Sequence, residues 1–367
     1  MTGVAGMRVV VVGAGALGSV LAFMLQADGA KVVLVDPAAL GDNASGVAAG
    51  MLAPAFETVL DSGPDSGAVD DLELLLAARE AWLTFASRLD GLNGRIVRCG
   101  AMWVGDEASQ ADTLARLRAL GLGAEPIGAA DAERASPGLR APFGAIRTSE
   151  DWRLDPMAVL RTLRAAFLAA GGEVSAGAAR TMSSRGVGLA DGSEIVADAV
   201  ILATGMPPAG MHDAPRELEV LAPIKGQIVR FPGAGPLDGP ILRAPGVYIA
   251  PCGAGTVVGA TMEPGVADRR LDPAVIERFR ASAIAMLPHL AGASASGAAG
   301  VRASTPDGLP LAGPSSRAGV WVAMGARRNG WLLASLIARG IVDRMAGAPS
   351  DPWAPRFDPL RFATRRD

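Results

Sequence analysis

The segment VVVVGAGALGSVLAFMLQADGAKVVLVDP, residues 9–37, is the most informative part of this chain of 367 residues. Residues 7–12 form a short run rich in β-branched side chains, residues 16–28 carry apolar side chains at helical spacing, and residues 31–35 are apolar again. A β-branched run bounded by glycine indicates a strand, and the helical spacing indicates an amphipathic helix. The segment therefore predicts a β-α-β unit.

Gly13, Gly15 and Gly18 form a complete G-x-G-x-x-G motif at the junction of the predicted strand and helix. In this motif the first glycine permits the tight turn, the second lets the backbone approach a pyrophosphate, and the third lets helix and strand pack closely. Asp36 ends the second strand 18 residues after Gly18, where a carboxylate accepts hydrogen bonds from a ribose diol. The motif predicts a dinucleotide site but does not distinguish FAD from NAD.

Three later features favour FAD. The two histidines, His212 in a proline-rich loop and His289 at a helix end, do not support the catalytic histidine of an NAD-dependent dehydrogenase or a Ser-His-Asp site. Residues 200–205, VILATG, predict a buried strand that ends beside a cofactor. Residues 325–333, GARRNGWLL, predict a helix whose first N–H groups face the anionic N1/C2 edge of a flavin.

Composition and charge restrict the class of protein. Half of the residues are hydrophobic and 19% are charged, which indicates a globular chain, and its length fits two domains. A net charge of −3 with scattered arginines gives no basic footprint for nucleic acid. Cys99 and Cys252 have neither metal-ligand nor disulfide spacing, so no metal site is predicted. Because no long uninterrupted apolar run appears, we expect a soluble, cytoplasmic protein without a membrane segment.

The rest of the pattern completes the predicted architecture. It predicts helices at residues 71–89 and 156–170, one buried strand at 194–205, several short antiparallel strands within 223–262 and a last strand at 319–325. Asp155 is the expected N-cap of the second helix, followed by a proline in its first turn. Residues 41–57 are rich in small side chains, which predicts a loop over a ligand.

Five segments carry more specific patterns. They are SGVAAGMLAP (45–54), APIKGQIVRF (222–231), GVYIAPCGAGTVVGATMEPG (246–265), GVRASTPDGLPLAGPS (300–315) and RNGWLLA (328–334). In this order and spacing they resemble the D-amino acid oxidase family of FAD-dependent oxidoreductases, and its glycine oxidases most of all, over essentially the whole chain. The resemblance implies an α/β fold, α+β overall, with a Rossmann-like FAD-binding domain (1–86, 152–221 and 300–367) and a substrate-binding domain on a mainly antiparallel β-sheet (87–151 and 222–299).

The resemblance also implies residue roles. Non-covalently bound FAD would contact Gly13, Gly15, Ala16, Leu17, Gly18, Asp36, Pro37, Ala44, Ser45, Ala49, Gly50, Met51, Arg180, Gly205, Gly325, Ala326, Arg327, Arg328, Asn329, Gly330, Trp331 and Leu332. Asp36 would bind the adenosine ribose, and the backbone near Arg180 the adenine. Arg302 would pair in fork geometry with the carboxylate of the substrate, with Tyr248 and Arg328 beside it. The walls of the substrate pocket would be Met51, Met262 and Gly246.

The implied activity is oxidative deamination of glycine or another small amino acid, by hydride transfer from the α-carbon to flavin N5 with O₂ as acceptor. The products would be an imine or 2-oxo acid, ammonia and H₂O₂, and the imine of glycine would serve thiazole synthesis for thiamine. The partners are the amino acid and O₂, with no nucleic acid and no membrane, and a homo-oligomer is compatible with the sequence.

Two positions depart from the pattern of glycine oxidases. Gly246 stands where a bulky or polar residue is common, and Trp331 where a smaller aliphatic residue is common, so the resemblance implies a changed pocket volume. Glycine, sarcosine, D-alanine and D-proline all stay open as substrates. Other functions stay open too: a D-amino acid dehydrogenase with a different electron acceptor, an oxidase of sarcosine or another secondary amine, a flavin-binding protein without turnover, and an NAD-dependent dehydrogenase.

Overall fold

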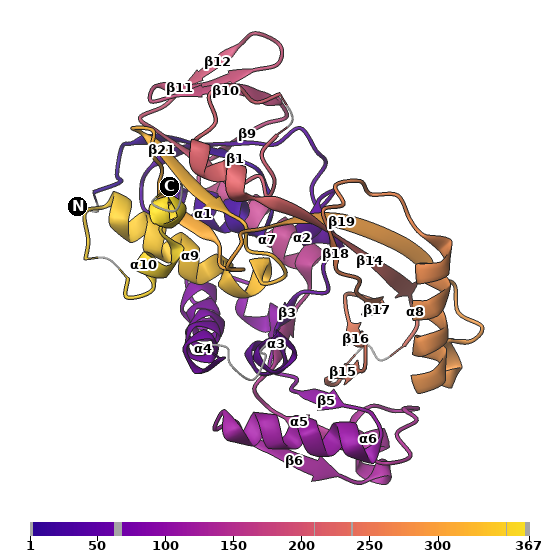
Figure 1. Cartoon of the computed structure of the whole chain (residues 1–367). Helices are drawn as coiled ribbons and strands as arrows, with labels where there is room; N and C mark the ends of the chain where they lie inside the picture. The colour runs from indigo at the N-terminus through magenta and orange to yellow at the C-terminus, as the bar shows by residue number, and fades with distance from the viewer. Residues whose placement is uncertain (1–2, 62–67, 209, 236–237, 350, 364–367) are drawn as a thin grey trace.

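A mainly parallel sheet of six strands carries the β-α-β unit in the computed structural model, which describes residues 3–61, 68–208, 210–235, 238–349 and 351–363 (Figure 1). Its order is β20-β21-β13-β1-β2-β9. The strands are β1 (Arg8–Val12), β2 (Lys31–Val35), β9 (Glu173–Ser175), β13 (Ala199–Leu202), β20 (Leu311–Pro314) and β21 (Val320–Met324). β1 pairs in parallel with β2 and β13, and α1 (Ala16–Ala27) connects β1 to β2, so the predicted unit is confirmed.

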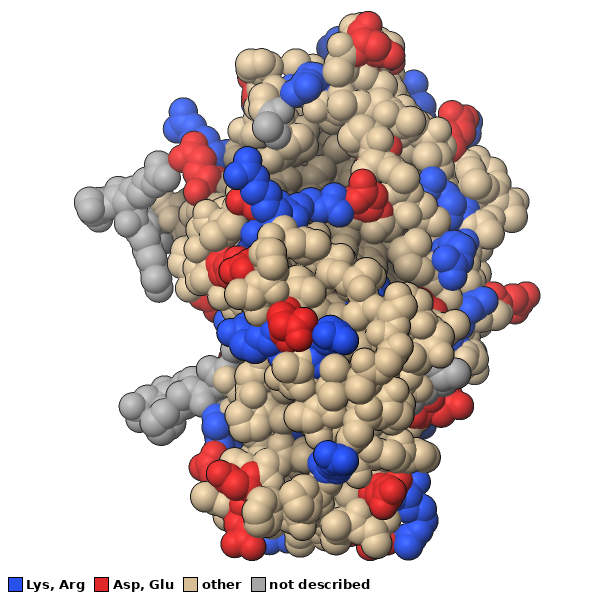
Figure 2. Space-filling view, turned by 90° about the vertical axis from the view of Figure 1, so that its right-hand side faces the viewer, with Lys and Arg blue, Asp and Glu red and all other residues tan. Residues whose placement is uncertain are grey.

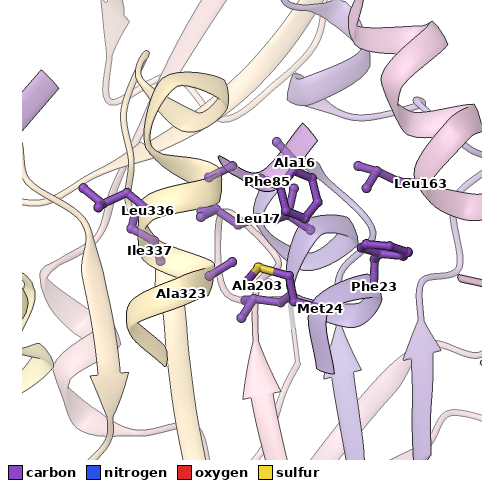
Figure 3. Close-up of a cluster of buried hydrophobic side chains, with 14 of the residues drawn as sticks. Ala16, Leu17, Phe23, Met24, Phe85, Leu163, Ala203, Ala323, Leu336 and Ile337 are labelled. Atoms are coloured by element: carbon purple, nitrogen blue, oxygen red, sulfur yellow. The ribbon is translucent and has the colours of Figure 1, made fainter. Parts of the chain in front are cut away.

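Helices share a buried hydrophobic cluster with this sheet (Figure 3). Besides α1, they are α4 (Ala68–Ala86), α7 (Pro156–Ala169) and α9 (Gly330–Met345). Figure 3 shows Leu17 of α1 beside Leu336 of α9, and Met24 of α1 next to Ala203 and Ala323. A helix that is apolar on nearly all sides is buried on nearly all sides. α1 therefore lies at the centre of this half of the molecule.

The second sheet has nine strands and is mainly antiparallel. Its order is β18-β14-β17-β16-β15-β5-β7-β6, with β19 paired to β14. The strands are β5 (Ala101–Trp103), β6 (Ala124–Ile127), β7 (Ala145–Thr148), β14 (Ala222–Pro232), β15 (Ile241–Ala244), β16 (Val247–Pro251), β17 (Gly255–Gly259), β18 (Glu263–Pro264) and β19 (Ser296–Ser304). The antiparallel strands expected within residues 223–262 are confirmed as β14 to β17, whereas β15 pairs in parallel with β5.

Two small sheets and further helices complete the fold. The small sheets contain β3 (Met51–Leu52), β4 (Ile96–Val97) and β8 (Trp152–Leu154), and β10 (Ala179–Ser183), β11 (Gly186–Leu189) and β12 (Glu194–Val196). The other α-helices are α2 (Ala44–Val47), α3 (Pro54–Asp61), α5 (Glu107–Ala119), α6 (Ala129–Ala135), α8 (Pro273–Met286) and α10 (Ala354–Phe357). The 3₁₀ turns are η1 (Asn93–Arg95), η2 (Arg216–Val220), η3 (Pro288–Leu290) and η4 (Pro359–Phe362).

The single buried strand expected at residues 194–205 is confirmed only for residues 199–202, which form the fully buried β13. The segment divides into β12 and β13, which belong to different sheets. Asp198 lies between them, where its Oδ2 accepts a hydrogen bond from the Arg8 backbone N–H at 2.8 Å. A carboxylate held at the first residue of β1 turns the chain into the parallel sheet, and a hydrophobic pattern alone does not reveal this turn.

The loop expected at residues 41–57 is also wrong, because this segment contains α2, β3 and α3. Asn43 begins α2, and its Oδ1 accepts hydrogen bonds from the backbone N–H groups of Ser45 and Gly46 at 3.0 and 3.1 Å. Oδ1 of Asp151 accepts a hydrogen bond from the backbone N–H of Ala55, in the first turn of α3, at 2.9 Å. Side-chain caps therefore stabilise short helices in a segment whose small residues have little helical pattern.

The Asp155 cap is confirmed, because its Oδ1 accepts a hydrogen bond from the Ala158 N–H at 3.0 Å. The division into domains stays a prediction, and β19 runs across its proposed boundary at residue 300. Within the ranges described, no helix is both long and apolar enough to cross a bilayer, and no three His, Cys, Asp or Glu side chains form a metal-binding group. Acidic and basic side chains are interspersed on the face in Figure 2.

Candidate active site

Two adjoining cavities lie where the two large sheets meet. The larger cavity has a volume of 540 Å³ and lies at the carboxyl ends of β1, β2, β13 and β21. The smaller cavity has a volume of 290 Å³ and lies against the second sheet. Residues that line both are Ala44, Ala48, Arg302, Arg328 and Trp331. Because ligands of open parallel sheets bind beyond the carboxyl ends of the strands, the larger cavity is the expected dinucleotide site.

The three glycines of the motif have separate steric roles. Gly13 has φ of 104°, and a Cβ there would lie 2.5 Å from the carbonyl oxygen of Ala203. A Cβ on Gly18 would overlap the carbonyl oxygen of Gly13, so this glycine lets α1 pack on the turn. Gly15 lies against the hydroxyl of Ser45 and lines the larger cavity. These contacts agree with the roles that the motif predicts.

Asp36 connects the glycine turn to the end of β2. Its Oδ2 accepts a hydrogen bond from Ala14 N–H at 2.7 Å, and its Oδ1 accepts one from Ala38 N–H at 2.8 Å. Each carboxylate oxygen has a second lone pair. Asp36 also lines the larger cavity, so it can accept a ribose hydroxyl while it holds the turn. The structural contact with Ala14 was not foreseen from the sequence.

Trp331 fixes α2 beside the turn. Its Nε1 donates to the carbonyl oxygen of Ser45 at 3.0 Å, and its own carbonyl accepts from Nε1 of Trp82 at 2.7 Å. The hydroxyl of Ser45 in turn accepts a hydrogen bond from Ala16 N–H at 2.9 Å. A buried tryptophan usually finds such a partner. The unusual indole therefore belongs to the scaffold around both cavities.

Most of the predicted cofactor residues line one of the two cavities. The larger cavity collects Gly13, Gly15, Ala16, Leu17, Asp36, Pro37, Ala44, Ser45, Arg180, Gly205, Gly325, Ala326, Arg327, Arg328, Gly330 and Trp331. The smaller cavity collects Ala49, Gly50, Met51 and Asn329. Two predicted positions line neither. Gly18 packs under the turn, and the side chain of Leu332 is 1% exposed within the hydrophobic cluster of α9.

Arg302 lies at the junction of the cavities. It is carried by β19, and its guanidinium covers Gly226 of β14, where a Cβ would lie 2.5 Å from its Cζ. Nη1 donates to the carbonyl oxygen of Thr261 at 3.3 Å and contacts Sδ of Met262 at 3.2 Å. Burial lowers the pKa of Arg302 from its usual value. Among the described residues no carboxylate forms an ion pair with it, which agrees with a guanidinium that receives an external anion.

Tyr248 of β16 and three wall residues complete the centre of the smaller cavity. Tyr248 pairs in register with Gly259, and a Cβ at that glycine would lie 3.2 Å from the phenolic oxygen. Burial raises the pKa of Tyr248, although Arg302 and Arg243 act in the opposite direction. The phenol therefore keeps its proton at neutral pH and can donate it in a hydrogen bond. The predicted wall residues Met51, Met262 and Gly246 also line this cavity.

Glu57 is an important residue that the sequence reasoning missed. It lies on α3, and its two oxygens form ion pairs with Arg328 Nε and, at 3.1 Å, with Arg243 Nη2. Nη2 of Arg328 also donates to the carbonyl oxygen of Glu57 at 3.1 Å. Burial alone would raise the pKa of Glu57, but Arg328 and Arg243 outweigh it and lower the pKa. Glu57 is therefore ionised and engaged on both oxygens.

Other residues that the sequence reasoning did not name individually also line the cavities, although several of them lie in segments that it singled out. Examples are Asp42, Asn43, Thr204 and Arg269 at the larger cavity and Gly226, Arg243 and Gly300 at the smaller one. Of these, Gly226 had a usable signal, because a glycine inside a strand of apolar residues often marks close approach of another group.

Comparisons with known proteins agree with this geometry. The family model DAO, described as FAD dependent oxidoreductase, matches residues 8–344. A glycine oxidase of Pseudomonas aeruginosa is 30% identical over 376 residues, which cover 97% of this chain and 98% of the relative. The crystal structure of glycine oxidase from Geobacillus kaustophilus is similar with a TM-score of 0.81 at 26% identity, over 97% of this chain and 99% of that one. A D-amino acid dehydrogenase 2 of Ralstonia nicotianae is 35% identical over 182 residues, 44% of this chain and 42% of the relative.

Proposed function

The chain belongs to the DAO family of FAD-dependent oxidoreductases, and from this premise we propose that it catalyses the oxidative deamination of a small amino acid with O₂ as electron acceptor. The overall reaction would convert the amino acid, O₂ and water into a 2-oxo acid, ammonia and H₂O₂. Glycine is the first substrate to test, because the full-length relative from P. aeruginosa is named a glycine oxidase. Its imine would then be available for thiazole synthesis.

The larger cavity fits FAD by shape and by hydrogen-bonding capacity. Gly13 and Gly15 leave the backbone at the start of α1 free of side chains, and Asp36 offers acceptor oxygens at the far end. A helix N-terminus with such a turn stabilises phosphate charge. FAD bound here would supply the two-electron acceptor for a hydride from the α-carbon of the substrate. The residues at this site would hold it non-covalently.

The observation that carries the proposal is the position of Arg302. Its half-buried guanidinium lies between the two cavities, without a carboxylate partner among the residues described. A planar guanidinium binds a carboxylate through two parallel hydrogen bonds, which orient the substrate as well as hold it. Tyr248 would donate a third hydrogen bond to the same carboxylate. This arrangement would fix the α-carbon relative to the larger cavity.

The proton balance needs no base on the protein. Glu57 is the one acid among the described residues that line the smaller cavity, and both of its oxygens are engaged by arginines. It is therefore a poor proton acceptor for the substrate. We infer that the amino acid reacts as the neutral amine, which loses its ammonium proton to water before the hydride leaves.

Anaerobic reduction tests the proposal. The purified holoenzyme is mixed with glycine, sarcosine, D-alanine or D-proline, and bleaching of the flavin absorption is followed. We expect at least one of them to bleach the flavin, and air to restore it with one H₂O₂ per substrate consumed. A flavoprotein that no amino acid reduces would refute the proposal. A protein without flavin absorption would also refute it and would favour a nicotinamide cofactor.

A D-amino acid dehydrogenase is the second candidate. The partial match to D-amino acid dehydrogenase 2 of R. nicotianae favours it, although that match extends over only 44% of the chain. The same assay separates the two functions. Reduction by a D-amino acid, slow reoxidation by air and fast reoxidation by a soluble quinone would support the dehydrogenase.

A further inference from the structure

Arg243 is a third cationic side chain at the smaller cavity, besides Arg302 and Arg328. It lies on β15, where it pairs in register with Tyr248 of β16. Its Cζ is 5.7 Å from the ring centroid of Phe56 and 5.8 Å from that of Tyr248. Arg243 is only 5% exposed, yet it lines the cavity. Its guanidinium is thus held between two aromatic rings at the cavity wall.

The hydrogen-bonding capacity of Arg243 is not filled. A guanidinium has five N–H donors. Nη2 donates to Oε1 of Glu57 at 3.1 Å, whereas Nε is buried and has no hydrogen-bond partner within the described parts of the chain. Glu57 is also shared with Arg328. The described residues provide no acceptor for Nη1 either, and Nη1, unlike Nε, is not sealed from the cavity, so an acceptor placed there would stabilise the buried charge of Arg243.

Arg302 and Arg243 occupy different places at the wall of the smaller cavity. Arg302 lines both cavities, whereas Arg243 lines the smaller cavity alone. In the sheet, β14, β17 and β16 lie between their strands, β19 and β15. Tyr248 is near both, since each guanidinium influences the pKa of its hydroxyl. Along the sheet, Arg243 therefore lies beyond the strand of Tyr248 as seen from Arg302, and Glu57 connects it to Arg328, which lines both cavities.

We propose that Arg243 binds a second anionic group of the substrate, so that the preferred substrates are small amino acids with a second carboxylate. Arg302 takes the carboxylate next to the reacting carbon, and Arg243 takes the distal one beyond Tyr248. This inference rests on the proposed function, because it assigns the substrate class of the same site. The described lining of the smaller cavity contains three arginines, Arg243, Arg302 and Arg328, and one acid, Glu57. A substrate with two carboxylates would pair with both Arg302 and Arg243, whereas glycine would pair with Arg302 alone.

Matched acid and amide substrates test the inference. Both enantiomers of aspartate and asparagine, and of glutamate and glutamine, are compared by kcat/KM for flavin reduction, because each pair has nearly the same size but differs in charge. For the reactive enantiomer we expect the acid to exceed the amide by tenfold or more. Arg243→Gln should lower the acid-to-amide ratio by roughly 10- to 100-fold, mainly through KM, as expected for a lost hydrogen bond to a charged group.

A control and a second variant keep the test decisive. Arg147→Gln removes an exposed arginine of the same sheet, which pairs with Glu125, and should leave the ratio unchanged. Glu57→Gln removes the acid that competes for Arg243, so it should raise the ratio, the opposite of Arg243→Gln. Melting temperatures of all variants identify any loss of folding.

The possible results separate this inference from the proposed function. A native enzyme that uses amide and acid equally, or prefers glycine to both acids, refutes the diacid inference and leaves the oxidase standing. The same follows if Arg243→Gln lowers kcat/KM for acid and amide alike, because that result assigns Arg243 a structural role. Failure of every amino acid to reduce the flavin refutes both.

Discussion

Gly226→Ala should displace Arg302 without changing its chemistry. A Cβ at residue 226 would lie 2.5 Å from the Cζ of Arg302, and ordinary van der Waals contact begins at 3.4 Å, so the guanidinium must move by about 1 Å. The neighbour is the end of a flexible side chain, which makes local displacement easier than unfolding. A misplacement of about 1 Å lowers catalytic efficiency by roughly 100-fold. We therefore expect kcat/KM for the best amino acid to fall by about that factor, with flavin content and melting temperature nearly unchanged.

The matched control is Gly123→Ala, because a Cβ at this surface glycine meets no atom within 4 Å. A double-mutant cycle sharpens the test. In an Arg302→Ala background there is no guanidinium to displace, so Gly226→Ala should cause little further loss. Two results would refute the idea that Gly226 provides the space for the Arg302 guanidinium. One is a native kcat/KM in Gly226→Ala, and the other is a double variant in which the two losses of kcat/KM simply add.

Three further predictions concern single residues. Arg302→Ala should raise KM and slow flavin reduction more than Arg302→Lys, which keeps the charge but loses the fork; native stopped-flow rates in Arg302→Ala would contradict a carboxylate role. Asp36→Ala should weaken FAD binding by about 1–3 kcal/mol, and full flavin content after gel filtration would count against it. Burial raises the pKa of Asp151 to about 7, above its usual value of about 3.9, so the folded state binds an extra proton and the free energy of unfolding falls as pH rises between these values. Asp151→Asn should flatten this fall in urea titrations at several pH values, and equal slopes would show that another group is responsible.

The dinucleotide turn was predictable because its constraints are local. Gly13 needs a positive φ and Gly18 needs contact with the turn five residues earlier, so the spacing of the motif contains the geometry. The Asp155 cap is local in the same sense, since its acceptor lies three residues before the N–H that it binds. Within residues 41–57 the Asn43 cap of α2 is local as well, but the hydrogen bond to the first turn of α3 comes from Asp151, 96 residues away from Ala55, which no local rule reveals.

The charge network of the smaller cavity was beyond sequence reasoning for the same reason. Glu57 and Arg243 are 186 residues apart, and the carbonyl oxygen of Glu57 and Arg328 are 271 apart. Taken singly, each charged residue is most simply interpreted as solvated. Only the folded chain, in which Glu57 of α3 meets Arg243 of β15 and Arg328 just before α9, brings the three together. The sequence therefore predicted Arg328 as a site residue but not the acid that holds it.

The position of the Arg302 side chain depends on the register between β14 and β19. In the pairing of β14 with β19, Arg302 is opposite Ile224 and Gly300 is opposite Gly226, so Arg302 reaches Gly226 along a diagonal of the antiparallel ladder. A Cβ on Gly300 would lie 3.0 Å from Cα of Ala44, so this glycine lets α2 approach the same point. Gly226 on β14 thus leaves room for the guanidinium, and Gly300 on β19 leaves room for α2. A shift of one residue would move Arg302 to the opposite face of the sheet. The position of Arg302, which we propose binds the substrate carboxylate, thus depends on a pairing between segments about 75 residues apart, and the motif alone does not give the register of that pairing.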